Sequence, residues 1–286
     1  MRIPLSLIKI NILGRFPFVR LQQVLDNPAY LIHIIKKNLI YKRSRYDYTS
    51  HYTDFTFLNP SQTLDKLMSG QISLARFGDG EFEQLTGGGE YPPDSDWCQR
   101  CSAALRKDLF AVLSSKDDHL LVAPVSPHKF LSREQTGHTL PFFPNMWVDT
   151  RRLMWRYLDK GRSYGDANIF VSGSSNQSID WDKLRTYLRG FDIIIATGNT
   201  PSLTHLKIGR RLFFVECGKE NAFERKEKIK QDIRDVIAHH HLDKNQVIVF
   251  ASLGPTAGII AHQFLPENIR VWDTGHMFKY AAEKET

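Results

Sequence analysis

Two carboxylates stand one residue apart in the sequence LARFGDGE, which runs from Leu74 to Glu81. On an extended or turning backbone, the side chains of Asp79 and Glu81 can point the same way. Two carboxylates from one short loop suit a hard divalent cation such as Mn²⁺ or Mg²⁺. Gly78 and Gly80 permit a tight turn and the close approach of a ligand. Acidic glycine-rich turns that bind nothing are also common, so this motif alone leaves both interpretations open.

A second segment with turn chemistry is ATGNT, at residues 196–200, which ends an apolar run. The turn at Gly198 and Asn199 could offer backbone N–H groups to a nucleotide. The same two residues are equally suited to reversing the chain without binding anything.

A third segment, SLGPTAG at residues 252–258, predicts the start of a helix. Gly254, Pro255 and Thr256 would leave unpaired N–H groups and the positive end of the helix dipole facing a phosphate. Thr256 could equally act only as a cap. The segment has no GK[ST] and does not fit GxGxxG, which argues against a Walker-type ATPase and a dinucleotide dehydrogenase.

A fourth segment, WDTGH, closes the last apolar run of the chain. Asp273 and His276 could join a metal site or act as acid and base; a histidine that only forms structural hydrogen bonds is the alternative. Two other patterns favour no function. CQRC, from Cys98, falls in a predicted helix and lacks a second cysteine pair, and the three histidines at 239–241 suit a solvated helix end.

The elements that must position these residues alternate between strands and helices. Short apolar runs rich in Ile, Val and Phe predict strands, and longer amphipathic stretches between them predict helices. Strands are expected at 72–78, 119–124, 168–173, 191–199, 210–218, 245–252 and 269–276, and helices at 98–115, 145–159, 222–241 and from 255. This order indicates an α/β, Rossmann-like domain over residues 56–286, with a mostly parallel sheet and helices on both faces.

The N-terminal segment 1–55 differs from the rest because its first 50 residues carry a net charge equal to that of the whole chain. Residues 1–50 contain nine Lys and Arg against two Asp, whereas the remaining residues carry 29 of each sign. An apolar side and a basic end predict a helix at 29–46, as a basic appendage. It either rests on an anionic membrane surface or packs on the main domain with a solvated face.

The class of protein is narrowed by what the sequence lacks. Three cysteines favour a reducing compartment, no apolar run is long enough to span a bilayer, and the N-terminus has no small-residue cleavage site. We therefore expect a cytoplasmic protein, peripheral at the inner face of the membrane if residues 1–50 contact it. The basic patch has no recognisable nucleic-acid module, so nucleic acid is not an expected partner.

The motifs, taken in order, resemble those of the GT-D glycosyltransferases, a family first described as a domain of unknown function. The resemblance covers Ser73 to Tyr280. Its parts are SLARFGDGE with a DxE motif, YGDANIF at 164–170, the Gly198–Asn199 turn, KENAF at 219–223, LGPTA at 253–257 and DTGH at 273–276. Two segments depart from the family pattern, IIIATGNTPS before and after the turn and KIGRRLFF at 207–214.

The resemblance implies a Rossmann-like enzyme that transfers a hexose from a nucleotide sugar, UDP-linked in our expectation. Asp79 and Glu81 would hold Mn²⁺ or Mg²⁺ against the donor diphosphate, and His276 would complete the metal shell or contact phosphate. The catalytic set expected is Asp79, Glu81 and His276, and the donor-binding set is Arg76, Gly78, Gly198, Asn199, Asn221, Gly254, Pro255 and Thr256. The expected acceptor is a surface glycan or a lipid-linked oligosaccharide.

Alternatives from other classes remain open at this stage. They are a non-catalytic subunit that binds a nucleotide or phosphoglycan, and a phosphoester hydrolase that uses the same carboxylates with His276. An inverting transferase would also need a general base, for which Glu216, Asp273 and Asp149 are the candidate carboxylates.

Overall fold

The computed structural model of the protein describes residues 9–11, 18–20, 49–86, 99–128, 143–170, 179–198, 208–275 and 277. The chain divides into two compact units. The first joins Met1–Asp54 to Pro127–Tyr157, and the second joins Phe55–Ser126 to Leu158–Thr286. The boundary expected between residues 55 and 56 lies beside the break at Asp54, but no sequence pattern indicated that residues 127–157 group with the N-terminal segment.

In the first unit, the described residues form short elements and one long helix. Strands β1 (Lys9–Asn11) and β2 (Phe18–Arg20) pair antiparallel. The 3-10 turn η2 (Thr49–Tyr52) is joined to helix α7 (Phe143–Tyr157), because the Tyr52 hydroxyl donates a hydrogen bond to the carbonyl of Arg151. The helix predicted at 29–46 lies outside the described residues.

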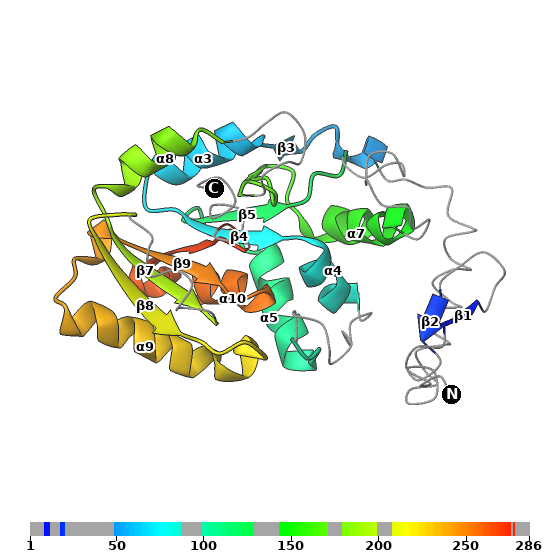
Figure 1. Ribbon diagram of the computed structural model, residues 1–286. Coiled ribbons are helices and arrows are strands. Elements are labelled where there is room, and N and C mark those ends of the chain that lie inside the picture. The colour runs from blue at the N-terminus through cyan, green and yellow to red at the C-terminus, as the bar shows by residue number, and fades with distance from the viewer. Residues whose placement is uncertain are drawn as a thin grey trace, which may run out of the picture. The chain divides into compact units, whose positions relative to one another are not determined.

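The second unit is built on a six-stranded sheet in the order β5-β4-β10-β9-β7-β8 (Figure 1). Its strands are β4 (Ser73–Phe77), β5 (Leu120–Pro124), β7 (Asp192–Thr197), β8 (Arg211–Glu216), β9 (Val247–Ser252) and β10 (Arg270–Asp273). Every neighbouring pair is parallel, which confirms the predicted α/β class. All six residues of β7 are buried, as expected of a strand covered on both faces.

Helices cover both faces of this sheet (Figure 1). They are α3 (Pro60–Met68) and α8 (Trp181–Leu188) on one face, and α5 (Ala103–Leu113), α9 (Lys226–His239) and α10 (Pro255–Gln263) on the other. Leu64 of α3, Leu184 of α8 and Trp272 of β10 share one apolar core. On the opposite face α10 approaches closely, since a Cβ added at Gly258 would lie 3.3 Å from the Cβ of Ala75.

The remaining elements of this unit are short. Strands β3 (Thr56–Phe57) and β6 (Ser163–Tyr164) form a separate parallel pair. There are also three 3-10 turns. The turn η4 (Ala222–Arg225) leads into α9, η5 (Lys244–Gln246) leads into β9, and η6 (Leu265–Glu267) lies between α10 and β10.

The winding of the chain reverses between two neighbouring strands. From β7 the chain proceeds to β8 at the sheet edge, whereas from β9 it proceeds to β10 in the opposite direction. In open α/β sheets such a reversal opens a crevice beyond the carboxyl ends of the strands, and ligands bind there. The topology therefore directs attention to the residues that follow Thr197 and Ser252.

Two predicted elements differ from the structure. Residues 168–170 form turns instead of a strand, because the Asp166 carboxylate accepts the Asn168 N–H at 2.8 Å and its carbonyl accepts the Ile169 N–H; residues 171–173 lie outside the described part. The helix predicted from 98 begins only at Ala103, since the Ser102 side chain caps its first turn.

Among the described residues, none of the helices has the length and apolarity needed to cross a membrane.

Candidate active site at the carboxyl edge of the sheet

The acidic motif lies at the start of a helix. Strand β4 ends at Phe77 and helix α4 (Asp79–Thr86) begins almost at once. Side chains two positions apart on a helix diverge by about 200°, so the expectation that Asp79 and Glu81 point the same way is wrong. Asp79 is exposed, and its Oδ1 accepts the N–H of Gly80 at 3.0 Å. Glu81 is half-buried and turns back toward the sheet.

The Glu81 carboxylate closes the first turn of α4. Its Oε2 accepts the N–H of Gly78 at 2.8 Å, while the Gly78 carbonyl accepts the N–H of Phe82. A glutamate three residues into a helix often makes this contact. Burial raises the pKa of Glu81 to about 7, and the nearby carboxylate of Asp273 adds to this increase, whereas the Gly78 hydrogen bond opposes it.

Asp273 reaches the same place from β10, the neighbour of β4. It is buried, and its carboxylate accepts the backbone N–H of Arg76 at 3.3 Å, the Arg76 Nε at 3.4 Å and the N–H of Gly275 at 3.1 Å. Burial raises the pKa of Asp273, and the Arg76 guanidinium opposes that increase. The structure thus joins Glu81 and Asp273, from opposite ends of the sequence, into one acidic pair.

Arg76 holds this pair in place. Besides Asp273, its guanidinium donates to the carbonyl of Ala167 at 2.7 Å, which ties β4 and β10 to the YGDANIF segment. Glycine suits position 275, because its φ is +49° and an added Cβ would lie 1.7 Å from an Arg76 nitrogen and displace that guanidinium. The donor contact expected of Arg76 stays a prediction, and the described bonds give this residue a positioning role as well.

The carboxylates of Glu81 and Asp273 suit a cation that a bound diphosphate also coordinates. Among the described residues, no three His, Cys, Asp or Glu side chains gather to hold a metal ion on their own. The acidic pair nevertheless places two carboxylates beside a single guanidinium, and Mg²⁺ or Mn²⁺ bound with a diphosphate needs only one or two protein carboxylates. His276, the third expected ligand, lies outside the described residues.

At the winding reversal, Gly198 lets two strand-end loops touch. A Cβ added to Gly198 would lie 2.4 Å from the carbonyl oxygen of Gly218, which follows β8. The two loops are also joined by the N–H of Cys217, which donates to the carbonyl of Thr197 at 2.8 Å. A packing role therefore accounts for Gly198. Asn199 lies outside the described residues, so the nucleotide contact expected from this turn stays a prediction.

The start of α10 presents backbone to open space. Gly254 precedes the helix with φ +55° and ψ −141°, and no atom lies within 4 Å of a Cβ added there. Pro255 is the first helical residue, and no side chain caps this end. Thr256 is fully buried and its hydroxyl contacts Gln99 at 3.4 Å, so a phosphate at this end would meet backbone groups and not that hydroxyl.

Gln99 is a site residue that the sequence analysis missed. It is buried, and its Oε1 accepts both the N–H of Phe223 at 3.1 Å and the Thr256 hydroxyl. Asn221 adds a second link, because its Oδ1 accepts the N–H of Arg100 at 2.9 Å. These bonds fasten the KENAF and LGPTA motifs to residues 99–100. No pattern could have indicated Gln99, a single polar residue ahead of a helix.

The three candidate bases belong to three different elements. Asp273 belongs to the acidic pair, whereas Glu216 is exposed at the end of edge strand β8 and accepts the N–H of Gly218 at 3.3 Å. Asp149 lies on α7 in the first unit, and its side chain is outside the described residues. Among the described carboxylates, Asp273 is thus the base candidate that lies beside Glu81.

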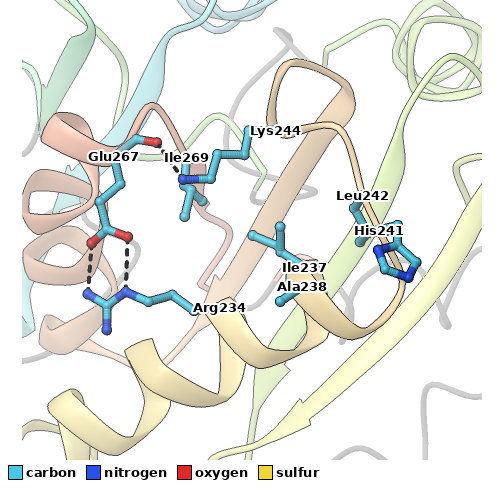
Figure 2. A pocket seen from close by; sticks show the side chains of 8 residues that line it. All are labelled: Arg234, Ile237, Ala238, His241, Leu242, Lys244, Glu267 and Ile269. Atoms are coloured by element: carbon cyan, nitrogen blue, oxygen red, sulfur yellow. Dashed lines mark hydrogen bonds and ion pairs between the residues drawn. The ribbon is translucent and has the colours of Figure 1, made fainter.

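A pocket of about 400 Å³ lies away from this site. Its lining residues come from the end of α9, from η5 and η6, and from Ile269 just before β10, so it opens at the amino edge of the sheet (Figure 2). The Arg234 guanidinium and the Glu267 carboxylate form two hydrogen bonds there, and Lys244 donates to the Glu267 carbonyl. Because these charges already interact with one another, the pocket is a weaker candidate site.

The fold and the acidic pair define an α/β protein with its candidate site at the carboxyl edge of a parallel sheet. The model of the glycosyltransferase GT-D fold family matches residues 74–283. The chain therefore belongs to this glycosyltransferase family, as the motifs predicted.

Individual relatives agree with this assignment. The chain is 24% identical over 269 residues to a probable glycosyl transferase Gly of Streptococcus gordonii, covering 88% of this chain and 35% of that protein. It is 26% identical over 231 residues to the glycosyltransferase GlyD of Streptococcus pneumoniae serotype 4, covering 76% of this chain and 26% of that protein. The chain thus spans about a third of one relative and a quarter of the other.

Solved structures show the same fold. A highly conserved domain of unknown function 1792, described as having a distinct glycosyltransferase fold, superposes with a TM-score of 0.64 at 20% identity, over 84% of this chain and 86% of that chain. A glycosyltransferase of the same domain type from Streptococcus sanguinis superposes with a TM-score of 0.58 at 22% identity, over 78% and 82%.

Proposed function

We propose that the protein transfers a hexose from a nucleotide sugar, UDP-linked, to a surface-glycan or lipid-linked oligosaccharide acceptor, in a reaction that requires Mn²⁺ or Mg²⁺. The observation that supports this most is the acidic pair of Glu81 and Asp273 in a chain of the GT-D family. Asp79, exposed on the first turn of α4, stays a predicted ligand that the described geometry does not bring to this pair.

The chemistry of the donor explains why this edge needs positive charge. When the sugar–phosphate bond breaks, negative charge grows on the departing nucleoside diphosphate. A divalent cation held by Glu81 and Asp273 would supply the Lewis acid that stabilises this charge. Arg76 fixes the position of Asp273, and the open backbone at Gly254 leaves room for phosphate oxygens near the start of α10. His276 stays a predicted further ligand.

Location and acceptor belong to the same proposal. We place the protein in the cytoplasm, with residues 1–50 at the inner face of the membrane, where a lipid-linked acceptor is presented. The nine Lys and Arg of this segment would be attracted to anionic lipid.

Calorimetric titration with UDP tests the site. Wild-type protein should bind UDP in Mn²⁺ and lose at least about tenfold in affinity in EDTA, because the diphosphate then faces uncompensated carboxylates. Glu81→Ala and Asp273→Ala should show the same loss in Mn²⁺. Asp118→Ala removes an exposed carboxylate just before β5, at the amino edge, and should bind like the wild type.

A second assay distinguishes a transferase from a non-catalytic binding subunit. A transferase supplied with UDP-hexose and no acceptor should release UDP slowly, in a reaction that requires Mn²⁺ and Glu81. UDP binding that is unchanged by EDTA and by both substitutions would refute the metal role. Tight donor binding without any UDP release would indicate the non-catalytic subunit, and turnover of simple phosphoesters would indicate the hydrolase.

A further inference from the structure

The positive charge of the chain is concentrated in the first unit. Residues 1–54 and 127–157 together hold 14 Lys and Arg against five Asp and Glu, a net charge of +9, while the rest of the chain has 24 against 26. Residues 127–157 contribute a net charge of +3 to this unit, and the acidic residues that balance it lie in the rest of the chain. Helix α7 lies in this second stretch, so it shares a strongly basic unit with residues 1–54.

Helix α7 exposes an aromatic and basic face. Trp155 is 44% exposed and is the one large apolar side chain that is exposed among the described residues. Arg152 and Arg156 are exposed too, and the spacing of three and four residues places all three side chains on one side of the helix. Thr150 and Met154, on the opposite side, are each 1% exposed.

The indole of Trp155 packs against a neighbouring aromatic ring. The ring of His51, from η2, lies nearly perpendicular to it, with ring centres 4.9 Å apart. At the next residue, the Arg156 guanidinium lies over the ring of Tyr157, 5.7 Å from its centre. The exposed face thus combines an amphipathic indole, which has one ring contact with η2, and the guanidinium groups of Arg152 and Arg156.

These groups fit the chemistry of a membrane surface. Tryptophan concentrates at the depth of lipid headgroups, where one side of its ring meets acyl chains and its N–H meets water. Guanidinium groups form paired hydrogen bonds with phosphate, and a unit of charge +9 is attracted to anionic lipid within about one Debye length, roughly 8 Å at physiological salt. A merely solvated face would need no exposed tryptophan.

We infer that the face of α7 formed by Arg152, Trp155 and Arg156 is a contact site for an anionic lipid bilayer. The inference deepens the proposed function, because it assigns the membrane contact to a described helix in addition to residues 1–50. Both ends of residues 127–157 continue into the second unit, at Ser126 and Leu158. Lipid bound by α7 would therefore tether the transferase unit through two covalent connections.

Sedimentation with lipid vesicles tests this inference, using the whole chain without donor or acceptor. Wild-type protein should sediment with vesicles of equimolar phosphatidylglycerol and phosphatidylcholine, and far less with phosphatidylcholine alone. Arg152→Glu with Arg156→Glu should lower the partition coefficient about 30-fold or more, since each basic group near the surface adds roughly a fivefold factor. Trp155→Ala should lower it as well, and its residual binding should vanish at high salt.

A matched control keeps the test specific. Lys107→Glu with Arg189→Glu makes the same change of net charge at exposed positions in the second unit, and should reduce vesicle binding only slightly. All substituted side chains are exposed, so thermal midpoints should stay close to wild type; if the double arginine variant fails to fold, Trp155→Ala decides the question.

Three outcomes would overturn the inference. They are equal losses in the α7 and control variants, equal wild-type binding to neutral vesicles, and binding to a soluble polyanion such as single-stranded DNA as tightly as to vesicles without any need for Trp155. UDP binding measured without lipid does not depend on this face. Failure of lipid binding with intact UDP binding would thus refute the α7 contact and leave the proposed function standing.

Discussion

The Glu81 carboxylate stabilises a helix through a hydrogen bond, and it is also a candidate ligand for a cation. Its hydrogen bond to the Gly78 N–H stabilises the first turn of α4 whether or not a ligand binds. Its burial next to Asp273 makes ionisation unfavourable and raises its pKa to about 7. A capping glutamate on an open surface would not show this increase, so the position of the carboxylate favours a site that receives a cation.

The raised pKa predicts how stability depends on pH. The unfolded chain loses this proton near 4.5, whereas the native protein keeps it up to about 7. The native state therefore binds more protons between these values, and the free energy of unfolding falls as the pH rises through them, by an amount on the order of 3 kcal/mol. Glu81→Gln should escape this fall and be more stable than wild type at pH 8.

Urea unfolding in EDTA at pH 5 and pH 8 measures the effect. The difference between wild type and Glu81→Gln should be small at pH 5 and largest at pH 8. Asp118→Asn, at an exposed position, should follow the wild-type curve. Parallel pH dependence in wild type and Glu81→Gln would show that the carboxylate ionises normally.

Among the elements, the strand-end loops at the winding reversal depend on close backbone approach. Gly198→Ala would place a methyl group 2.4 Å from the Gly218 carbonyl oxygen, and backbone cannot rotate away as a side chain can. We expect a loss of about 2 kcal/mol in the free energy of unfolding. Gly70→Ala, where no atom lies within 4 Å of the added Cβ, should change stability little. Equal effects of the two substitutions in urea unfolding would contradict this packing.

At the amino edge of the sheet, Asp192 joins the starts of β7 and β8. Its fully buried carboxylate accepts hydrogen bonds from both Arg210 and Arg211, with closest distances of 2.6 and 2.7 Å. Hydrogen bonds from both guanidinium groups hold its pKa well below its ordinary value of 3.8. This stabilisation is therefore present at neutral pH and is lost as the pH falls below about 4.

Asp192→Asn should lower the free energy of unfolding by about 2 kcal/mol at pH 7. This loss is smaller than for a fully buried ion pair, because the two arginine side chains are nearly half exposed. The difference from wild type should shrink in urea unfolding at pH 3. Asp182→Asn, which breaks an exposed pair with Arg185, should have a much smaller effect. UDP binding should be unchanged in Asp192→Asn, since the residue lies at the edge opposite the candidate site.

For the whole molecule, ligand binding should increase the free energy of unfolding. UDP with Mn²⁺ at a hundred times the dissociation constant should raise the free energy of unfolding of the wild type by about 2.7 kcal/mol. Because the cation binds ionised carboxylates, the affinity should rise with pH up to about pH 7. In thermal shift measurements, UDP with Mn²⁺ should not stabilise Glu81→Gln or Asp273→Asn in this way. A stabilisation that survives in both variants would place the ligand elsewhere.

Several parts of the fold were predictable from local pattern. Runs such as DIIIAT and VIVFAS indicated strands because a parallel strand covered on both faces must be apolar along its length. Helices such as α9 showed an apolar stripe, and Pro255 marked a helix start. The pattern failed at residues 168–170, where Asp166 bonds its own backbone and turns an apolar run away from the sheet.

The sequence by itself determined the six strands of the main sheet and helices α5, α7, α9 and α10. It also determined the family through its ordered motifs and the glycines that allow tight turns, since these depend on neighbours along the chain. Only the tertiary structure decided which acidic residues meet. It separated Asp79 from Glu81 by starting a helix at Asp79, and it joined Arg76 to Asp273 across 197 residues. Strand order cannot be inferred from strand content, because parallel pairing in the sheet is set by long-range packing and not by local pattern.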